Sequence, residues 1–413
     1  MNFAKAIAIL TSISSAMATL TVSTATQYQS VTGIGGMLGW NDYPTNVVDT
    51  LYGTGSANLG LNILRCRVSE NGETDWATEA ASIKEALRVN PNLIVFCSVW
   101  TAPASMLTTL SSAPAGCNYD KILSTSSWAA YATYLNSFIS FMKNNGAPIY
   151  AISIQNEPDW TWTCWTAANM RDWLAEYGSQ IVGAKVIAPE SLGFSETYLN
   201  TILSNTAAAA AVNIIGGHLY GSTPYSFNSN GRDIWMTEKY WDAGWSNTLG
   251  MSNEMTQVFN AGWNAYVHWW TCGYLLGDGS TGYSCTNNVV TPRGWVYALW
   301  TKNVLPGYKR VATTGSAGTS SAAFASSGKI VVMLTNTGSD TSTTISVPQF
   351  SSVVVSAVSA SQQSIFTVST TANGNSITFT LPASSVAAIV FNTSGSTPVT
   401  TTNVKTTTTT IAA

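Results

Sequence analysis

The most evident deficit of this 413-residue chain is charge. Only 9% of its residues are Asp, Glu, Lys or Arg, against roughly 25% in an average soluble protein. Lys and Arg total 17 and Asp and Glu total 20, which gives a formal net charge of −3. A nucleic-acid partner requires a basic patch, so this composition argues against one.

Histidine and long apolar runs are also scarce. The two histidines, His218 and His268, stand in no metal-binding spacing. We expect packing or substrate-pocket roles for them, and neither a metal nor another cofactor. Beyond the N-terminus no run approaches the roughly 20 apolar residues of a membrane span, so we expect no membrane partner either.

Aromatic residues are abundant, with 16 Trp and 17 Tyr. A surface built from neutral Ser, Thr, Asn and Gly is typical of secreted proteins that act on neutral polymers. Residues 1–18 resemble a secretory leader, since Lys5 precedes an apolar stretch and Ala16-Met17-Ala18 offers a small-x-small cleavage site. We expect cleavage after Ala18 and an extracellular, monomeric protein; the alternative is a buried N-terminal helix.

Six cysteines then lie in an oxidising compartment, where fifteen pairings are possible and the sequence does not choose among them. Cys272 with Cys285 would close a short loop, and Cys117 with Cys164 would join two long ones. Cys66 and Cys97 lie in apolar runs, where they are interpreted as buried thiols.

Short apolar runs alternate with helical patterns such as 75–89, 127–145 and 168–182 over residues 33–306. Eight such alternations over about 270 residues predict an α/β fold, a (β/α)₈ TIM barrel. The expected strands are 33–40, 61–69, 92–100, 149–158, 185–190, 213–221, 233–241 and 265–273.

The pattern changes after Pro306. Residues 307–393 contain β-rich runs separated by Gly, Ser and Asn, which predict an antiparallel β-sandwich beside the barrel. The alternating residues 19–32 are expected to add N-terminal strands to this sandwich. The Thr-rich residues 394–413 form a low-complexity tail that is predicted to be disordered.

Two glutamates follow two of the predicted barrel strands. Glu157 ends the fourth in "ISIQNEP" and Glu238 ends the seventh in "WMTEKYW". The carboxyl ends of barrel strands meet at one rim, where active sites of this fold lie. Two carboxyl groups there suit glycosidic bond cleavage, with one as acid and the other as nucleophile. For either residue alone, a helix cap or a structural strand end is the alternative.

The motifs resemble those of glycoside hydrolase family 30, in its endo-xylanase and glucuronoxylanase branch, over roughly residues 20–393. That family joins a barrel to a sandwich made from the C-terminus and the first strands, as expected here. The motifs, which occur in order at matching strands, are "GIGG", "NILRCRV", "SVWTAPASM", "ISIQNEPDW", "WMTEKYW" and "WW".

The resemblance implies a role for each matching residue. Glu157 would be the acid/base and Glu238 the nucleophile, kept ionised by Arg65 and hydrogen-bonded by Tyr220. Asn156 would bind a sugar 2-hydroxyl. Because sugar rings stack on aromatic faces, aromatic residues near these positions are the other candidates for binding a polysaccharide of the xylan type. The further substrate-binding candidates are Trp40, Trp100, Trp160, His218, Tyr240 and Trp270.

One departure from the family concerns charge. Glucuronoxylanases carry cations after strands seven and eight, whereas this chain has Thr271, Cys272 and Gly273 there and no Arg before Arg293, which is expected to anchor the next helix. Strict dependence on glucuronate is therefore not expected. Three hypotheses stay open: a secreted retaining endo-β-1,4-xylanase, a hydrolase of another β-linked polymer such as β-1,6-glucan or β-1,6-galactan, and a non-catalytic carbohydrate-binding barrel.

Overall fold

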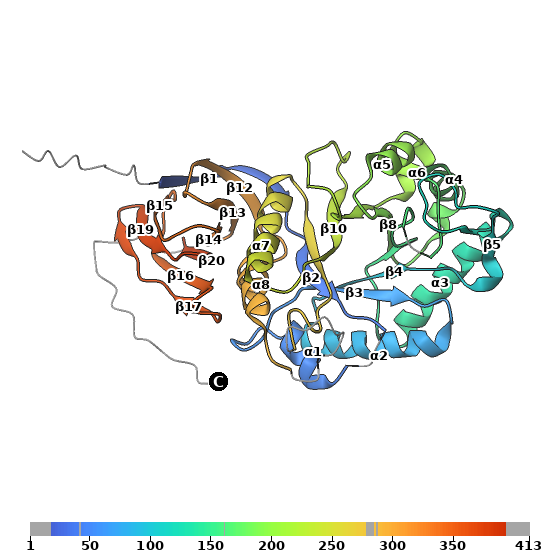
Figure 1. The fold of residues 1–413 in the computed structure, drawn as a ribbon, viewed down its shortest axis with the longest axis horizontal. Helices are drawn as coiled ribbons and strands as arrows, with labels where there is room; N and C mark the ends of the chain where they lie inside the picture. Colours follow the sequence, from blue (N-terminus) through green and yellow to red (C-terminus); the bar gives the residue numbers. More distant parts are fainter. Residues whose placement is uncertain (1–17, 41–42, 161, 278–284, 286–287, 394–413) are drawn as a thin grey trace, which may run out of the picture.

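The computed structural model describes residues 18–40, 43–160, 162–277, 285 and 288–393. A barrel surrounded by helices occupies one end of the molecule and a large β-sheet the other (Figure 1). The predicted leader, apart from Ala18, and the predicted tail 394–413 lie outside the described residues. No helix among the described residues is both long and apolar enough to cross a membrane.

The barrel is closed by eight parallel strands, one for each predicted strand. Its strand β7 is the shortest, with three residues in place of the ten predicted, because the chain leaves the ladder before the segment that carries Glu157. In the order in which they pair, the strands are β10 (Asp233–Tyr240), β11 (Ala265–Trp269), β2 (Gly33–Met37), β3 (Ile63–Val68), β4 (Ile94–Val99), β7 (Ala151–Ser153), β8 (Lys185–Ser191) and β9 (Ile214–His218).

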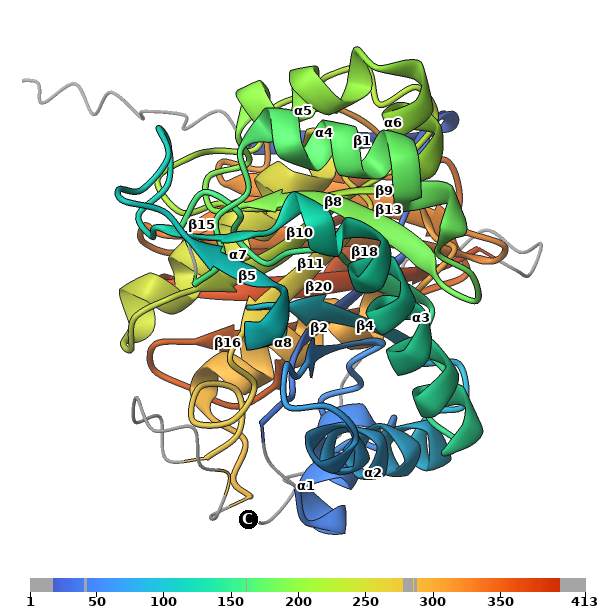
Figure 2. The same ribbon diagram turned by 90° about the vertical axis from the view of Figure 1, so that its right-hand side faces the viewer.

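Helices surround these strands, and Figure 2 shows them from the side of the barrel that faces away from the large sheet. The three predicted helical segments correspond to α2, α3 and α4. The helices are α1 (Thr45–Tyr52), α2 (Glu73–Val89), α3 (Trp128–Asn144), α4 (Ala167–Tyr177), α5 (Glu196–Leu203), α6 (Thr206–Ala211), α7 (Trp245–Asn260) and α8 (Pro292–Asn303), with single 3₁₀ turns η1 (Ala104–Met106), η2 (Thr125–Ser127) and η3 (Gly178–Gln180).

Alternation along the strands decides which side chains enter the barrel. On β3, Leu64 and Val68 pack in the core beneath the helices, whereas Ile63 belongs to the small apolar cluster inside the barrel. Successive side chains of a strand point to opposite faces, so Arg65 shares the inward face of Ile63. This register places a fully buried cation inside the barrel.

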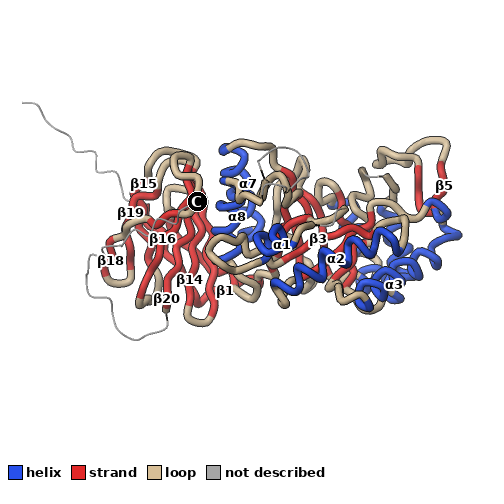
Figure 3. Tube along the Cα trace, turned by 90° about the horizontal axis from the view of Figure 1, so that it is seen from below, coloured by secondary structure: helices blue, strands red, loops and turns tan. Residues whose placement is uncertain are grey.

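A hairpin of β5 (Leu107–Thr109) and β6 (Lys121–Leu123) interrupts the alternation between β4 and α3. The hairpin lies on the side of the barrel that is farthest from the large sheet (Figures 1 and 3). The disulfide Cys117–Cys164 joins the hairpin loop to the segment after β7. The hairpin and that segment therefore form one cross-linked part of the rim.

The other end of the molecule is a ten-stranded sheet that curls around its own apolar core, as expected for the side sandwich. The N-terminal segment joins it as β1, antiparallel to β12 and parallel to β15. In spatial order its strands are β17 (Phe366–Thr367), β16 (Ser352–Ser359), β20 (Ser385–Asn392), β14 (Lys329–Asn336), β13 (Ser320–Ser326), β12 (Lys309–Gly315), β1 (Ala18–Ser30), β15 (Thr341–Ser346), β19 (Ser376–Leu381) and β18 (Thr371–Asn373).

Helices α7 and α8 connect the two parts, and they lie between the barrel strands and the sheet (Figures 1 and 3). The rings of Phe259 on α7 and Phe324 on β13 meet at 5.4 Å. The Ser252 and Thr335 hydroxyls are 2.7 Å apart, and the Trp300 indole donates to Ser252 at 2.9 Å. The contact is therefore a buried interface with its polar groups paired.

The cysteines correct one interpretation. Cys66 and Cys97 are not buried thiols, since they form a disulfide between β3 and β4. The two residues are direct neighbours in the parallel ladder, with Cα atoms 4.4 Å apart, within the range that a disulfide spans. The other two pairs, Cys117–Cys164 and Cys272–Cys285, are those considered from the sequence.

Candidate active site

Glu157 lies on the loop that follows β7, with its side chain almost fully buried at the mouth of the barrel. Its backbone is in the left-handed region (φ 42°), which is uncommon for a residue other than glycine. The Glu157 N–H donates to the Glu190 carbonyl at 2.9 Å, and the Asn156 N–H donates to the Val99 carbonyl at 2.6 Å. Bonds to strands on both sides therefore hold the Glu157 backbone in this conformation.

Glu238 lies within β10, and a break in the register aims its side chain. Ile234 and Met236 pack beneath the helices, whereas Trp235 lies in the barrel interior. Strict alternation would turn Glu238 outward with Met236. The pairing of β10 shifts register just after Met236 against both neighbours, β9 and β11, and such bulges re-aim side chains.

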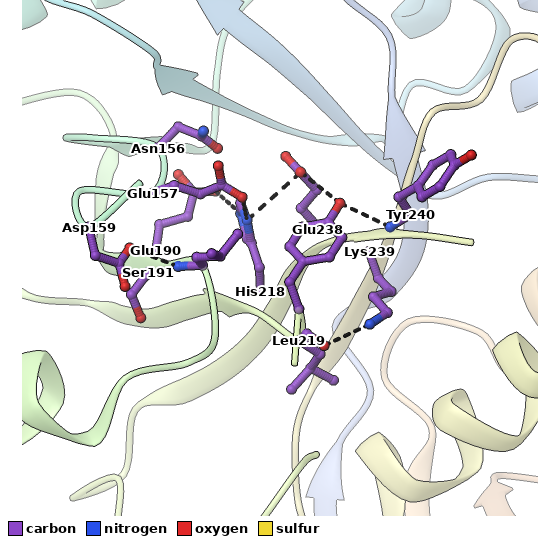
Figure 4. A network of polar contacts seen from close by, with 12 residues as sticks. Asn156, Glu157, Asp159, Glu190, Ser191, His218, Leu219, Glu238, Lys239 and Tyr240 are labelled. Atoms are coloured by element: carbon purple, nitrogen blue, oxygen red, sulfur yellow. Dashed lines mark hydrogen bonds and ion pairs between the residues drawn. The ribbon is translucent and has the colours of Figure 1, made fainter. Parts of the chain in front are cut away.

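The two glutamates face each other across a histidine (Figure 4). The His218 Nδ1 atom lies 2.8 Å from Glu157 Oε1 and 3.9 Å from Glu238 Oε1. One carboxylate oxygen from each glutamate and one ring nitrogen all lie within 4.8 Å of one another. The sequence-predicted pair is therefore brought together at one point of the rim.

Arg65 organises the floor of this site. Its guanidinium forms an ion pair with Glu238 and donates to Asn156 Oδ1 at 2.5 Å and to Glu190 Oε1 at 3.2 Å. Its Nε donates to the Ser98 hydroxyl at 3.3 Å. A planar guanidinium with five N–H donors suits such a position, since it fixes several acceptors at once.

Tyr220 holds the other oxygen of the Glu238 carboxylate. Its hydroxyl donates to Glu238 Oε1 at 2.9 Å and accepts the Tyr240 N–H at 3.0 Å. Burial, together with the charge of Glu238, raises the pKa of the Tyr220 hydroxyl well above its usual range. The raised pKa favours the neutral hydroxyl, which can donate to Glu238.

The charges of the cluster favour a proton on Glu157. Burial raises the pKa of Glu157 above its usual value and the charge of Glu238 adds to this, although His218 and Arg65 act in the opposite direction. Burial alone would lower the pKa of His218, but the surrounding carboxylates outweigh it and raise that pKa to about 9. For Glu190, burial by itself would raise the pKa, as it does for Glu157. The charges of Arg65 and His218 outweigh burial and lower the pKa of Glu190 below its usual value.

Two cations thus face three carboxyl groups in a site sheltered from water. If all three were ionised, the cluster would carry one net negative charge, and burying an unpaired charge is costly. A proton on Glu157 makes the cluster neutral, with Glu190 and Glu238 ionised. The surroundings of Glu157 therefore favour its protonated form.

Four tryptophan rings form a wall beside the pair. Trp40 packs against Trp100 at 4.7 Å and Trp270 at 5.2 Å between ring centroids, and Trp269 against Trp40 at 5.7 Å. The Arg65 guanidinium lies 4.7 Å from the Trp100 ring centroid, within the range of a cation–π contact. Arg65 therefore joins the aromatic wall to Glu238.

Trp40 is positioned by a residue that sequence reasoning missed. Its backbone has a φ of 66°, and its N–H donates to Glu79 Oε1 on α2 at 3.0 Å. Glu79 is buried, which raises the pKa of its carboxyl to about 7, although the Trp40 N–H and the charge of Arg67 act in the opposite direction. No pattern in the sequence separates Glu79 from the other acidic residues of its helix.

Two other predicted residues, Trp160 and Tyr240, follow the two glutamates along the chain. Trp160 is 51% exposed on the loop after Glu157, and the Tyr240 hydroxyl donates to Asp242 at 2.9 Å. His268 is fully buried with its ring 5.7 Å from that of Tyr297; burial, followed by the charge of Arg293, lowers its pKa. The structure thus gives His268 a packing role, whereas His218 contacts the glutamates.

Glu190 was also missed, although a signal was present. It follows β-forming residues in "KVIAPE", the same arrangement of a strand followed by an acid that singled out Glu157. Its Oε1 accepts from Arg65 at 3.2 Å and from the Ser98 hydroxyl at 3.0 Å. Applied to every predicted strand, the same rule would have found Glu190.

The trio Glu157, His218 and Glu238 is the one group of the described residues whose ligand atoms are close enough to hold a metal ion. Its oxygens are already used, because Arg65 and Tyr220 bind Glu238 and His218 contacts Glu157. A guanidinium in direct contact would repel a cation. The arrangement fits proton transfer and nucleophilic attack better than metal binding.

Arg293 anchors α8, as the sequence suggested. Its guanidinium donates to the Trp241 carbonyl at 2.6 Å and to the Asp242 carbonyl, and the side chain is buried. It therefore ties α8 to the loop after β10, and its Nε also donates to the Thr248 hydroxyl on α7 at 3.4 Å.

Comparisons with known proteins agree with this geometry. A family model described as "Glycosyl hydrolase family 59" matches residues 64–277, which cover the barrel from β3 onward. Over almost the whole chain the similarity is to another family. The glucuronoxylanase XynC of Bacillus subtilis (strain 168) is 33% identical over 401 residues, 90% of this chain and 92% of that protein. Two solved xylanases of glycoside hydrolase family 30 are 30% and 32% identical to this chain and cover 90% of it. The chain belongs to glycoside hydrolase family 30.

Solved structures of this family have the same architecture. A family 30 endoxylanase from Clostridium papyrosolvens C71 is 30% identical with a TM-score of 0.80, covering 90% of this chain and 99% of that one. The subfamily 8 xylanase Xyn30A from Clostridium acetobutylicum is 32% identical with a TM-score of 0.81 at the same coverage. The family 30 chain described here is therefore a glycoside hydrolase with the barrel and side sandwich of its relatives.

Proposed function

We propose that this family 30 hydrolase is a secreted endo-β-1,4-xylanase that cleaves xylan with retention of configuration. The observation that carries the mechanism is the spacing of the pair, since carboxylate oxygens of Glu157 and Glu238 lie within 4.8 Å of each other. Retaining glycosidases place these groups about 5–5.5 Å apart, whereas inverting enzymes need roughly 6.5–9.5 Å to admit a water molecule.

In the first step, Glu238 attacks the anomeric carbon while Glu157 gives its proton to the departing glycosidic oxygen. The C–O bond to the leaving chain breaks and an ester to Glu238 forms. Arg65 and Tyr220 orient the Glu238 carboxylate through their contacts with its two oxygens. The tryptophan wall provides faces on which a sugar ring can stack.

In the second step, Glu157 is a carboxylate and takes a proton from a water molecule. The oxygen of that water molecule attacks the anomeric carbon at the same time. The ester bond breaks, Glu238 returns to its carboxylate form and Glu157 is protonated again. Two inversions leave the configuration unchanged. His218 supports both forms of Glu157, because its Nδ1–H can donate to Glu157 Oε1 in either state.

The substrate class rests on the relatives, which are named glucuronoxylanase and endoxylanase. We infer that this chain does not require a glucuronate branch. Arg recognises a carboxylate through its fork of donors, and Arg293 already donates to two backbone carbonyls and to the Thr248 hydroxyl. From Thr271 to Pro292 the sequence contains no Lys or Arg.

Two measurements test the proposal. Proton NMR of the first product formed from an aryl β-xylobioside should show the β-anomer, because retention preserves it, and an α-anomer would refute the double displacement. Product analysis on glucuronoxylan and on unsubstituted xylan should give comparable rates. Cleavage only at a fixed distance from each branch would refute the inference about glucuronate.

Secretion is part of the same proposal. It is supported by the leader-like residues 1–18 and by three disulfides, which persist in oxidising compartments. N-terminal sequencing of protein from culture medium should begin near Thr19. Retention of residues 1–18 in the mature protein would contradict the predicted leader.

A further inference from the structure

Two tryptophans stand apart from the other fourteen. Trp160 is 51% exposed and Trp162 is 47% exposed, whereas the remaining tryptophans are buried or half-buried. Both follow Glu157 within five residues. Large aromatic side chains left in water at a rim beside a catalytic pair indicate a surface kept for a ligand.

These two rings stand on a rigid base. The disulfide Cys117–Cys164 ties their loop to the β5–β6 hairpin, and the Cys164 N–H donates to the Lys121 carbonyl at 2.8 Å. The Thr163 and Thr101 hydroxyls are 2.7 Å apart, which links the loop to the segment after β4. The exposed rings are therefore held by a cross-linked frame, which lowers the entropy lost on binding.

The loop is also anchored from below. Trp165 is buried, and its backbone N–H donates to the Pro158 carbonyl at 3.0 Å. The Trp160 N–H donates to the Glu157 carbonyl at 2.8 Å, which joins the exposed segment directly to the catalytic residue. On the hairpin side Tyr119, two residues after Cys117, is 43% exposed. Tyr119, Trp160 and Trp162, here called the rim aromatics, thus share one frame.

We propose that the rim aromatics form a binding surface for the leaving-group part of the polysaccharide, a run of neutral pyranose rings beyond the cleaved bond. This inference rests on the proposed function. Glu157 protonates the glycosidic oxygen, which belongs to the departing chain, and the rim aromatics continue outward from Glu157. The tryptophan wall lies instead at the ends of β2, β4 and β11, beside Arg65, where it would enclose the sugar that is attacked.

The chemistry of the surface defines the ligand. A pyranose presents an apolar C–H face that stacks on indole and phenol rings. Within the loop 158–165 the only charged residue is Asp159, and its carboxylate accepts the Leu192 N–H at 3.0 Å. The surface therefore selects for ring shape and offers no cation for an acidic branch.

The test compares two substrates of one enzyme. An aryl β-xylobioside has no sugar on its leaving side, whereas xylohexaose and xylan do. Trp160→Ala and Trp162→Ala should each lower kcat/KM on xylan and xylohexaose about 3- to 10-fold, mainly through KM, and leave the aryl β-xylobioside within about twofold. The double variant should also shift the cleavage position along xylohexaose.

Matched controls keep the test decisive. Tyr28→Ala removes a ring that is 46% exposed on β1, far from the barrel mouth, and should change neither substrate. Trp160→Phe keeps a stacking face and should restore most of the loss, with an unchanged Tm. Equal losses on both substrates, or none on xylan, would overturn the proposal. Turnover of the aryl β-xylobioside by the unchanged enzyme reports on the proposed function alone, so the two can fail separately.

The frame provides a second test. The variant Cys117→Ser/Cys164→Ser removes the disulfide but keeps all three rings. Loss of the cross-link should raise KM on xylan about 2- to 10-fold while the aryl β-xylobioside is hydrolysed as before. An unchanged KM on xylan would show that the frame does not position the rings.

Discussion

The barrel and the sandwich differ in what they bury beside apolar side chains. The sandwich strands bury uncharged polar residues such as Thr335, Asn336 and Ser385. Among the described residues every buried Arg, Glu or His belongs to the barrel part. Burying charge is costly unless it is paired, and five of these residues, Arg65, Glu157, Glu190, His218 and Glu238, pair with one another in the candidate active site.

The sandwich shows the alternative way to stabilise a core. Its interior consists of residues such as Val332, Ile345, Ile377 and Ile389, which need no partners beyond good packing. In the barrel, Arg65 donates to several acceptors at once. Loss of the Arg65 side chain would therefore leave all of these buried acceptors without this donor. We infer that the same polypeptide separates a catalytic interior in the barrel from a structural one in the sandwich, and this separation can be tested.

Glu238→Gln tests the catalytic side most severely. The amide cannot attack the anomeric carbon, so kcat on xylan should fall by about 10⁴-fold or more, while xylan binding, followed by affinity electrophoresis, is kept. The Tm should change little, because the side chain keeps its shape and ionisation of Glu157 can keep the cluster neutral after the Glu238 charge is removed. Residual activity within about 100-fold of the unchanged enzyme would remove Glu238 from the nucleophile role.

Glu157→Gln should have the second largest effect. Loss of acid and base assistance should cost about 10²- to 10⁴-fold on xylan, but less for the first step of an aryl xylobioside whose leaving group needs no proton. Azide, a nucleophile that needs no general base, should restore turnover and yield a β-xylobiosyl azide. The alkaline limb of kcat/KM, which reports loss of the Glu157 proton, should disappear. Failure of azide to react would contradict the assignment.

Ile389→Ala tests the structural side. Ile389 is fully buried at the centre of β20, opposite Val332 on β14 and Val355 on β16. Removing its side-chain carbons should lower the free energy of unfolding by about 2–5 kcal/mol. Initial rates on xylan, measured well below the Tm, should stay within about twofold. A loss of kcat without a loss of stability would break the separation between the two interiors.

Local sequence pattern was enough to predict the eight strands and the joining of residues 19–32 to the C-terminal sheet, because strand periodicity and the size of the repeat are local properties. It also brought Glu157 and Glu238 to one rim. The sequence pattern could not predict the direction of the Glu238 side chain, because alternation alone turns it outward with Met236. Only a register shift against the two neighbouring strands turns it inward.

The Cys66–Cys97 bond was missed for a related reason. An apolar setting suggested two separate thiols, whereas the register of β3 against β4 places the two residues side by side. Glu79 could not be singled out, because its role arises from the approach of α2 to the Trp40 backbone. Pairing register and contacts between distant elements are properties of the folded chain.

Glu79→Gln should have the smallest effect among these tests of the difference between the barrel and the sandwich. Glu79 is a buried acidic residue of the barrel that does not belong to the Glu157–Glu238 pair. Its carboxyl has a pKa of about 7 in the folded protein against 4.5 ordinarily. The folded state therefore binds this proton more tightly than the unfolded state, and the contribution of Glu79 to stability is fullest below pH 4.5 and declines as pH rises to 7. Gln does not titrate, so the variant should become more stable relative to the unchanged protein over this range.

The expected gain is at most about 3 kcal/mol above pH 7, since one unit of pKa corresponds to about 1.4 kcal/mol. Urea unfolding of both proteins at several pH values between 4 and 8 measures it, and groups common to both cancel in the difference. Gln keeps an oxygen to accept the Trp40 N–H, so kcat on xylan should change less than about threefold. A stability difference that is the same at every pH would mean that Glu79 does not titrate in this range. The charge would then be tolerated through pairing with the Trp40 loop and Arg67, as in the catalytic cluster.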